Sequence, residues 1–162
     1  MKNTESITKI NSLIKDIRSC MFVTKGLNGE IKARPMSTQE VEFKDSIWFM
    51  TDKRSTKCKE IEKDNTVGLE YADGNGVTFV SVSGKASFVE DKQKIQEYWN
   101  PFLKAWFEGP EDPNIVLIEV SVTRAEYWDN KGGKIGGLAD VAIGALTGKQ
   151  NLLDEHEIFE FE

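Results

Sequence analysis

The sequence predicts a mainly β protein with flanking helices: a small antiparallel barrel of six strands, an N-terminal helix and a glycine-rich C-terminal tail. Six short segments rich in β-branched and aromatic residues follow one another along the chain. Most of them are joined by turn signals, which favour hairpins and therefore antiparallel pairing. With 162 residues, of which 39% are apolar and 30% charged, the chain suits one domain with a packed core. The barrel is expected over about residues 18–129 and the tail over residues 130–162.

The first three elements are predicted from periodicity and turn chemistry. A helix opens the chain, because apolar residues recur at spacings of three and four and form one face. Those residues are Ile7, Ile10, Leu13, Ile14 and Ile17. Strands over residues 20–24 and 30–36 are expected to form a hairpin around Leu27-Asn28-Gly29. Pro35 cannot donate a ladder hydrogen bond, so the second strand should lie at a sheet edge or end in a bulge.

The middle of the chain alternates strand and helix signals. Residues 46–51 form a β-branched and aromatic run, and residues 55–64 carry several good helix formers, so a strand is expected to enter a short helix. Strands follow over residues 66–71 and 76–89. They are separated by Asp73-Gly74-Asn75-Gly76, a strong hairpin signal.

The last predicted elements are a helix, a long strand and the tail. Asp91 is expected to cap a helix that runs to about Phe107. The core face of this helix is predicted to contain Ile95, Tyr98, Trp99, Phe102 and Trp106. The segment Gly109-Pro110-Glu111-Asp112-Pro113 ends the helix, and residues 115–128 then form one long strand. The glycine-rich tail from residue 131 contains a candidate short helix near residues 138–146.

Composition narrows the classes of function. The formal net charge is −6 and the basic residues are scattered, so neither nucleic acid nor an anionic membrane is an expected partner. Cys20 and Cys58 are far apart, which indicates reduced thiols and inert burial for Cys58. The first residues are acidic and polar where a signal peptide needs a long apolar region, and no run approaches about 18 apolar residues, so a cytoplasmic protein is expected. His156 is the only histidine, so Ser/His or Cys/His catalysis and a histidine-rich metal site are not expected.

The junction between the strand at residues 46–51 and the following helix is a candidate anion site. A helix N-terminus offers N–H groups that lack intrahelical partners, and the helix dipole adds to their attraction for an anion. The segment from Thr51 to Lys57 supplies hydroxyl groups and cations, and Arg34 on an earlier strand can add a bidentate guanidinium. From the residues alone a simpler interpretation is favoured, in which Ser55 or Thr56 caps the helix and the cations are solvated.

The order of these motifs resembles that of a known family. The segments Ala33-Arg34-Pro35-Met36-Ser37-Thr38, Ile47-Trp48-Phe49-Met50-Thr51 and Ser55-Thr56-Lys57-Cys58-Lys59-Glu60-Ile61 look like the FMN signatures of the pyridoxamine 5′-phosphate oxidase-like split barrels. More narrowly, the chain resembles the general stress protein 26 branch over about residues 5–130, through Gly84-Lys85-Ala86, Trp106 and Glu126-Tyr127-Trp128-Asp129. The resemblance implies a Greek-key split β-barrel that binds FMN, and it changes the favoured interpretation of the junction from a helix cap to a phosphate site.

The resemblance also implies the binding residues and the assembly. The phosphate would be held by Arg34, Ser55, Thr56 and Lys57. The ribityl chain and the flavin ring would lie along Pro35, Met36, Ser37, Met50 and Thr51. Family members are homodimers with two flavins at the subunit interface, so Trp128 and the region of Ser81 would reach the cofactor from the partner chain. As an alternative, Trp128 closes the barrel at a strand end, and core or dimer packing is expected for Trp99 and Trp106.

The reaction is less well defined than the cofactor. True pyridoxamine phosphate oxidases carry an Arg- and His-bearing motif after the tryptophan, whereas this chain has Asp129-Asn130-Lys131-Gly132-Gly133, so vitamin B6 oxidation is not expected. The first hypothesis is an FMN-dependent oxidoreductase of the general stress protein type that moves hydride to or from an unidentified small molecule. One alternative is a non-enzymatic flavin-binding or flavin-buffering module. Another is a split barrel with a deazaflavin or haem, and the single tail histidine disfavours haem.

Overall fold

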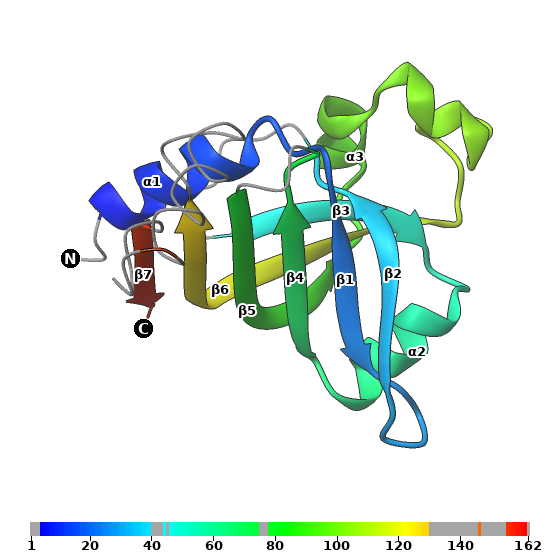
Figure 1. The fold of residues 1–162 in the computed structure, drawn as a ribbon. Helices are drawn as coiled ribbons and strands as arrows, with labels where there is room; N and C mark the ends of the chain where they lie inside the picture. The colour runs from blue at the N-terminus through cyan, green and yellow to red at the C-terminus, as the bar shows by residue number, and fades with distance from the viewer. Residues whose placement is uncertain are drawn as a thin grey trace.

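The computed structural model describes residues 4–39, 44, 46–74, 78–129, 146 and 155–161. Along this part of the chain seven strands and four helical segments follow one another (Figure 1). They are α1 (Thr4–Ile14), β1 (Ser19–Lys25), β2 (Ile31–Ser37), β3 (Ser46–Asp52), α2 (Thr56–Lys63), β4 (Thr66–Ala72), β5 (Thr78–Val89), α3 (Lys92–Tyr98), the 3-10 helix η1 (Pro101–Ala105), β6 (Ile115–Asp129) and β7 (Glu155–Glu160). All six predicted strands are present, and the two predicted helices that open the chain and follow β3 are confirmed as well.

The strands form one antiparallel sheet in the order β2-β1-β4-β5-β6-β3. The two ends of this order meet beyond the last residue of β2, where Thr38 forms a bridge with Phe49 of β3. The amide of Gln39 donates to the carbonyl of Trp48 over 2.9 Å at the same place. Among the described residues β2 and β3 meet at this end, which gives a barrel that is closed there and split at the other end and confirms the predicted fold class. Pro35 lies in β2, an end strand of the sheet, as its missing donor requires.

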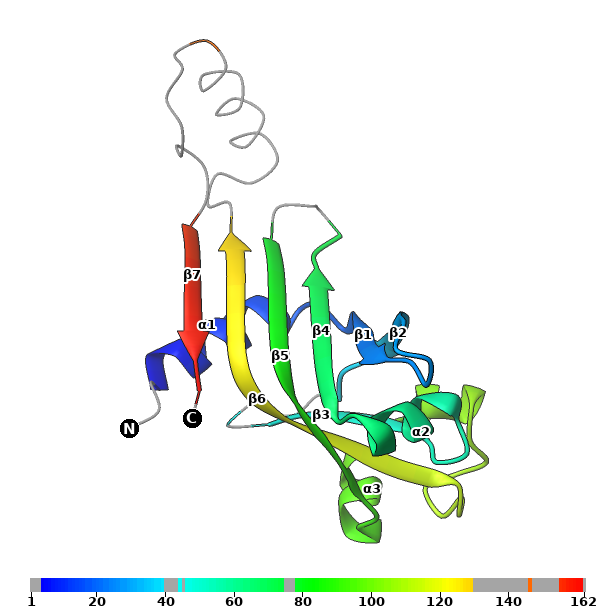
Figure 2. The ribbon, with the colours of Figure 1, turned by 90° about the horizontal axis from the view of Figure 1, so that it is seen from below.

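Strand β6 pairs with β5 along one edge, and on its other edge it changes partner halfway along its length. Its first half, Ile115 to Ser121, pairs with β3, and its second half, Arg124 to Asp129, pairs with β7 (Figure 2). β7 is a seventh strand that the sequence analysis did not predict. Its sequence, Glu-His-Glu-Ile-Phe-Glu, carries acidic residues that are depleted in strands, and these hide its strand character.

Two glycines are required by backbone geometry. Gly29 lies in the turn between β1 and β2 with φ of 86°, a conformation that other residues rarely adopt. Gly84 lies at a bulge in the pairing of β5 with β6, where a Cβ atom would stand 2.5 Å from the carbonyl oxygen of Ser121. The bulge bends β5 and β6, and this curvature lets the sheet close into a barrel.

Two hydrophobic clusters lie on opposite faces of β3. The larger fills the barrel, and its β3 members are Ile47 and Phe49. The smaller lies outside the barrel, between β3, β6, α3 and η1; its buried members are Trp48, Met50, Ile95, Leu103, Phe107, Ile115 and Leu117. Because both faces of β3 are buried, its sequence is continuously apolar rather than alternating.

The predicted helix from Asp91 to Phe107 is wrong as a single element. Asp91 caps α3 as expected, accepting bonds from the amides of Gln93 and Lys94, but α3 ends at Tyr98. Asn100 is extended, with φ of −135° and ψ of 156°, and the short helix η1 starts at Pro101. Proline disfavours a helical conformation in the residue before it, which explains the break.

The break changes which side chains face the core. Ile95 is buried, and Tyr98 and Trp99 pack against the smaller cluster as predicted. Phe102 and Trp106, also predicted for the core face, are 79% and 72% exposed. Leu103 and Phe107 are buried in their place. A different set of side chains faces the core because the helix starts again at Pro101.

No helix in the described ranges is long and apolar enough to cross a membrane. The candidate helix near residues 138–146 lies outside the described residues, apart from Leu146.

Candidate functional site

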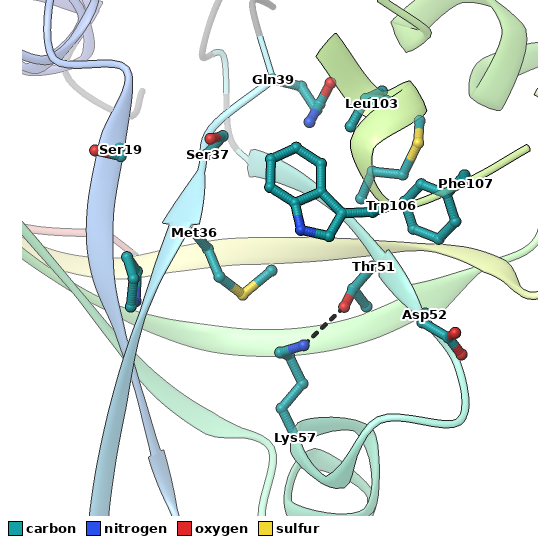
Figure 3. Close-up of a pocket in the computed structure, with 12 residues that line it drawn as sticks. Ser19, Met36, Ser37, Gln39, Thr51, Asp52, Lys57, Leu103, Trp106 and Phe107 are labelled. Atoms are coloured by element: carbon teal, nitrogen blue, oxygen red, sulfur yellow. Dashed lines mark hydrogen bonds between the residues drawn. The ribbon is translucent and has the colours of Figure 1, made fainter. Parts of the chain in front are cut away.

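A pocket of about 440 Å³ opens where the two hydrophobic clusters meet (Figure 3). It lies between the ends of β2 and β3, the first turn of α2, and η1 with the two residues that follow it. Its lining residues are Ser19, Pro35, Met36, Ser37, Gln39, Met50, Thr51, Asp52, Lys57, Leu103, Trp106 and Phe107. The volume lies within the ~300–1,000 Å³ that is usual for small-molecule and cofactor sites.

One end of the pocket carries a cation. Lys57 follows the first residue of α2, and its Nζ donates to the hydroxyl of Thr51 over 2.9 Å (Figure 3). Burial holds the pKa of Lys57 below its ordinary value, and the nearby Arg34 cation acts in the same direction. An anion bound beside Lys57 would replace the water that burial removes, so this end is suited to a negatively charged group.

The first turn of α2 contributes backbone donors rather than side-chain caps. Ser55 occupies the N-cap position, but its side chain makes no cap hydrogen bond to the helix. Its hydroxyl instead lies 3.5 Å from the sulfur of Cys58. Thr56 is exposed. The helix-cap interpretation therefore finds no side-chain cap here. The amide of Cys58 donates to the carbonyl of Ser55 over 3.1 Å, and the amides of Thr56 and Lys57 remain as donors for another group. Cys58 is buried and burial raises its pKa, in line with an inert thiol.

Arg34 is tied to a buried carboxylate behind the pocket. Its two terminal nitrogens donate to the hydroxyl of Thr24 over 2.6 Å and to Glu60 over 2.8 Å. Glu60, which points from α2 into the barrel, is 0% exposed and also accepts from Thr24. Lys32 Nζ lies 3.4 Å from the second Glu60 oxygen, an ion-pair distance without hydrogen-bond geometry. This cluster fixes the guanidinium and attaches α2 to β1 and β2.

The cluster keeps Glu60 charged. Burial raises its pKa, but the hydrogen bond from Thr24 and the charge and hydrogen bond of Arg34 outweigh burial and hold the pKa below its ordinary value. A guanidinium has five N–H donors, so Arg34 retains donors beyond those given to Thr24 and Glu60.

The acidic residue in the pocket lining is already paired. Asp52 accepts from the amide and the guanidinium of Arg54, with a shortest distance of 2.6 Å. This pairing lowers the pKa of Asp52 to about 2. Asp52 is therefore ionised at neutral pH and unsuited to act as a general acid, while Arg54 is occupied outside the pocket.

Most of the remaining lining is apolar, although it also includes Ser19, Ser37 and Gln39. Met36 and Met50 come from β2 and β3, and Leu103 and Phe107 from η1 and the residues after it. The indole of Trp106 projects toward the same space (Figure 3). A cationic end joined to an apolar end suits a ligand that has a phosphate and a planar ring.

The structure brings together six of the ten predicted site residues in this pocket. They are Pro35, Met36, Ser37, Met50, Thr51 and Lys57. Ser55 and Thr56 lie on the adjoining turn of α2, and Arg34 is held behind the pocket by Glu60.

Trp128 lies elsewhere. Asp52, in the pocket lining, is paired with Ile115 at the start of β6, whereas Trp128 is near the other end of that strand. There its ring stacks on His156 of β7, with ring centroids 5.1 Å apart. Trp128 of the same chain thus does not contact the pocket.

Sequence reasoning missed the pocket wall on η1 and the role of Glu60. The wall consists of Leu103, Trp106 and Phe107. Pro101 was the signal for it, since a restart of the helix there places these residues on a new face. No signal marks Glu60, because a buried glutamate in a short polar helix looks like a solvated one until the fold is known.

Comparison with known proteins agrees with this architecture. Residues 5–152 match the sequence profile of the family described as pyridoxamine 5′-phosphate oxidase like. The chain is 29% identical over 170 residues to Protein bli-3 of Neurospora crassa, covering 98% of this chain and 81% of that protein. It is 32% identical over 94 residues to General stress protein 26 of Bacillus subtilis, covering 55% of this chain and 67% of that protein.

A solved structure gives a similar result. The general stress FMN/FAD binding protein of Xanthomonas citri is 28% identical and superimposes with a TM-score of 0.68, over 80% of this chain and 92% of that one. The match of the profile to most of the chain, together with the split barrel, shows the family. The chain belongs to the pyridoxamine 5′-phosphate oxidase-like family and is similar to its general stress proteins.

Proposed function

We propose that the protein binds FMN in this pocket and uses it as an oxidoreductase on a small molecule. The observation that carries the proposal is the polarity of the pocket, with Lys57 at one end and an apolar wall at the other. The FMN/FAD binding protein of Xanthomonas citri, similar in sequence and fold, supports a flavin as the ligand. A bound flavin would supply the redox chemistry, and the protein would bind and orient it.

The residues divide the binding work. Lys57 and the amides of Thr56 and Lys57 would hold the phosphate, with the hydroxyls of Ser55 and Thr56 and the remaining donors of Arg34 close to it. Thr51 positions Lys57 through the bond to its Nζ. The ribityl chain and the ring would then lie along Pro35, Met36, Ser37 and Met50, which line the same pocket.

Replacing Lys57 tests this placement. Lys57→Ala should weaken FMN binding by ~1.5–3 kcal/mol, the usual range for a hydrogen bond to a charged group. Lys59→Ala is the matched control, because Lys59 is exposed on the same helix. FMN affinity is measured by titrating flavin-free protein and following flavin fluorescence. Equal affinities in the two variants would place the phosphate elsewhere.

The same titration should depend on pH. Lys57 must be protonated to attract the phosphate, and its pKa lies below the ordinary 10.5. Wild-type affinity should therefore fall as pH rises through the pKa of Lys57, and this loss should be absent in Lys57→Ala.

A second function, a flavin-binding or flavin-buffering module, remains in competition with the enzyme. The described pocket lining contains no histidine, and its one carboxylate is held ionised by Arg54, which favours a module. Anaerobic mixing of the FMN-loaded protein with NADH or NADPH separates the two. Bleaching of the flavin absorbance on a turnover timescale indicates a reductase.

We also propose a homodimer in which Trp128 reaches the flavin of the partner chain. Trp128 is half-buried and lies away from its own pocket, so a contact with flavin requires a second copy. Light scattering should give about twice the chain mass of 18.3 kDa. Trp128→Ala should lower FMN affinity about tenfold, the equivalent of ~1.4 kcal/mol. A monomer whose FMN affinity is unchanged by this substitution would refute the shared site.

A further inference from the structure

Trp106 is the one large side chain of the pocket lining that is mostly in water. It is 72% exposed, whereas Leu103 and Phe107 on either side are each 7% exposed. Exposed single aromatics are common, but this one lines a pocket that ends in a cation (Figure 3). A ligand bound in the pocket would cover the exposed indole and would account for a tryptophan at this position.

The backbone beneath Trp106 is anchored. The amides of Trp106 and Phe107 both donate to the carbonyl of Leu103 over 3.0 Å. The side chains of Leu103 and Phe107 are buried in the smaller hydrophobic cluster. An indole with two torsions on a fixed backbone loses little conformational entropy when a ligand covers it.

We propose that Trp106 is a stacking residue of the pocket and that its indole covers one face of the flavin ring. This inference rests on the proposed function, because it takes the flavin phosphate to be at Lys57. With the phosphate at that end, the ring lies toward Met36, Met50 and Trp106. The indole and the flavin ring are both planar π-systems, which stack in offset geometry, and the contact removes exposed apolar surface from water.

The test compares FMN with riboflavin, which lacks only the phosphate. Trp106→Ala should weaken binding of both ligands about tenfold or more, because the ring contact is common to both. Trp106→Phe retains a ring and should recover most of the affinity. Phe102→Ala is the matched control: Phe102 lies on the same segment, is 79% exposed and does not line the pocket, so neither affinity should change.

The two proposals fail in different ways in this experiment. Lys57→Ala should lower the affinity for FMN and leave that for riboflavin unchanged, whereas Trp106→Ala should lower both. The bound flavin should also fluoresce more strongly in Trp106→Ala, because a stacked indole quenches flavin emission. Wild-type affinities and emission in Trp106→Ala would overturn the stacking role even if Lys57 behaves as expected.

Core or dimer packing is expected for Trp106 from the sequence, and its exposure leaves a second copy of the chain as the other occupant to test. Light scattering on Trp106→Ala decides between these occupants. An unchanged assembly with weaker flavin binding supports stacking on the ligand. A change of assembly with unchanged binding of both flavins overturns it.

Discussion

The pocket has a charged wall where β3 passes into α2, with Asp52 and Lys57, and an apolar wall on η1 and the two residues after it, and different forces hold the two walls in place. The charged wall is fixed by a buried ion pair between Arg34 and Glu60 and by the barrel core behind it. The apolar wall is fixed by two buried side chains, Leu103 and Phe107, in the smaller cluster.

The two walls also differ in whether the same residue both stabilises the fold and serves ligand binding. Behind the charged wall, Arg34 neutralises a fully buried carboxylate, so this residue would serve both stability and the proposed phosphate site. On the apolar wall these tasks belong to different residues, since Leu103 anchors the segment and Trp106 faces the pocket. Substitution of Trp106 should therefore change binding with little effect on stability, whereas substitution of Arg34 should change both.

The largest expected effect is at Arg34. Arg34→Ala leaves the Glu60 carboxylate buried without its main partner and should lower the free energy of unfolding by about 3 kcal/mol at neutral pH. Lys57→Ala, which removes no partner of a buried charge, should cost much less stability. Urea denaturation of both variants measures the contrast. Equal losses in the two variants would contradict the double role of Arg34.

The Arg34 effect should depend on pH in a defined direction. The pKa of Glu60 is lower in the fold than its ordinary 4.5, so the carboxylate stabilises the wild-type protein above that pH. This contribution disappears as pH falls through the folded pKa. The stability gap between wild type and Arg34→Ala should thus be full at pH 7 and narrow below about 4.5.

A smaller effect is expected at Leu103. Leu103→Ala removes an anchor at the margin of the smaller cluster and should lower the free energy of unfolding by about 2 kcal/mol, the low end for such truncations. Flavin affinity should fall as well, because Trp106 loses its fixed backbone. Thermal unfolding compared with Phe102→Ala, which should stay within ~0.5 kcal/mol of wild type, isolates the anchor. A loss at Leu103 as small as that at Phe102 would show that the apolar wall needs no anchor.

The barrel strands could be predicted from the sequence because each is marked by residues that lie next to one another in the chain. The apolar run from Ile47 to Met50 and the turn at Gly29 each specify one element without reference to the rest of the chain. The segment from Thr51 to Lys57 was found in the same way, since a strand entering a helix is visible in a few residues.

The missed features depend on contacts between distant segments. Glu60 meets Arg34 and Thr24 only after α2 has packed against β1 and β2, and no spacing in the sequence records that meeting. Leu103 and Phe107 are buried because α3 stops before Pro101, so a helical projection that ignores the proline assigns the wrong face. Strand β7 was missed because its acidic residues give the segment a low strand propensity, while its pairing with β6 becomes visible only in the fold.

That pairing has a consequence for how the protein behaves at high concentration. Without β7, the second half of β6 would present a row of unsatisfied N–H and C=O groups to other molecules. Strand β7 covers this row and places Glu157 and Glu160 along the border of the sheet. Glu160 is paired with Arg124 and Glu157 accepts from Tyr127, so these carboxylates also attach β7 to β6, and an identical strand would bring like charges together on this border, which disfavours edge-to-edge pairing.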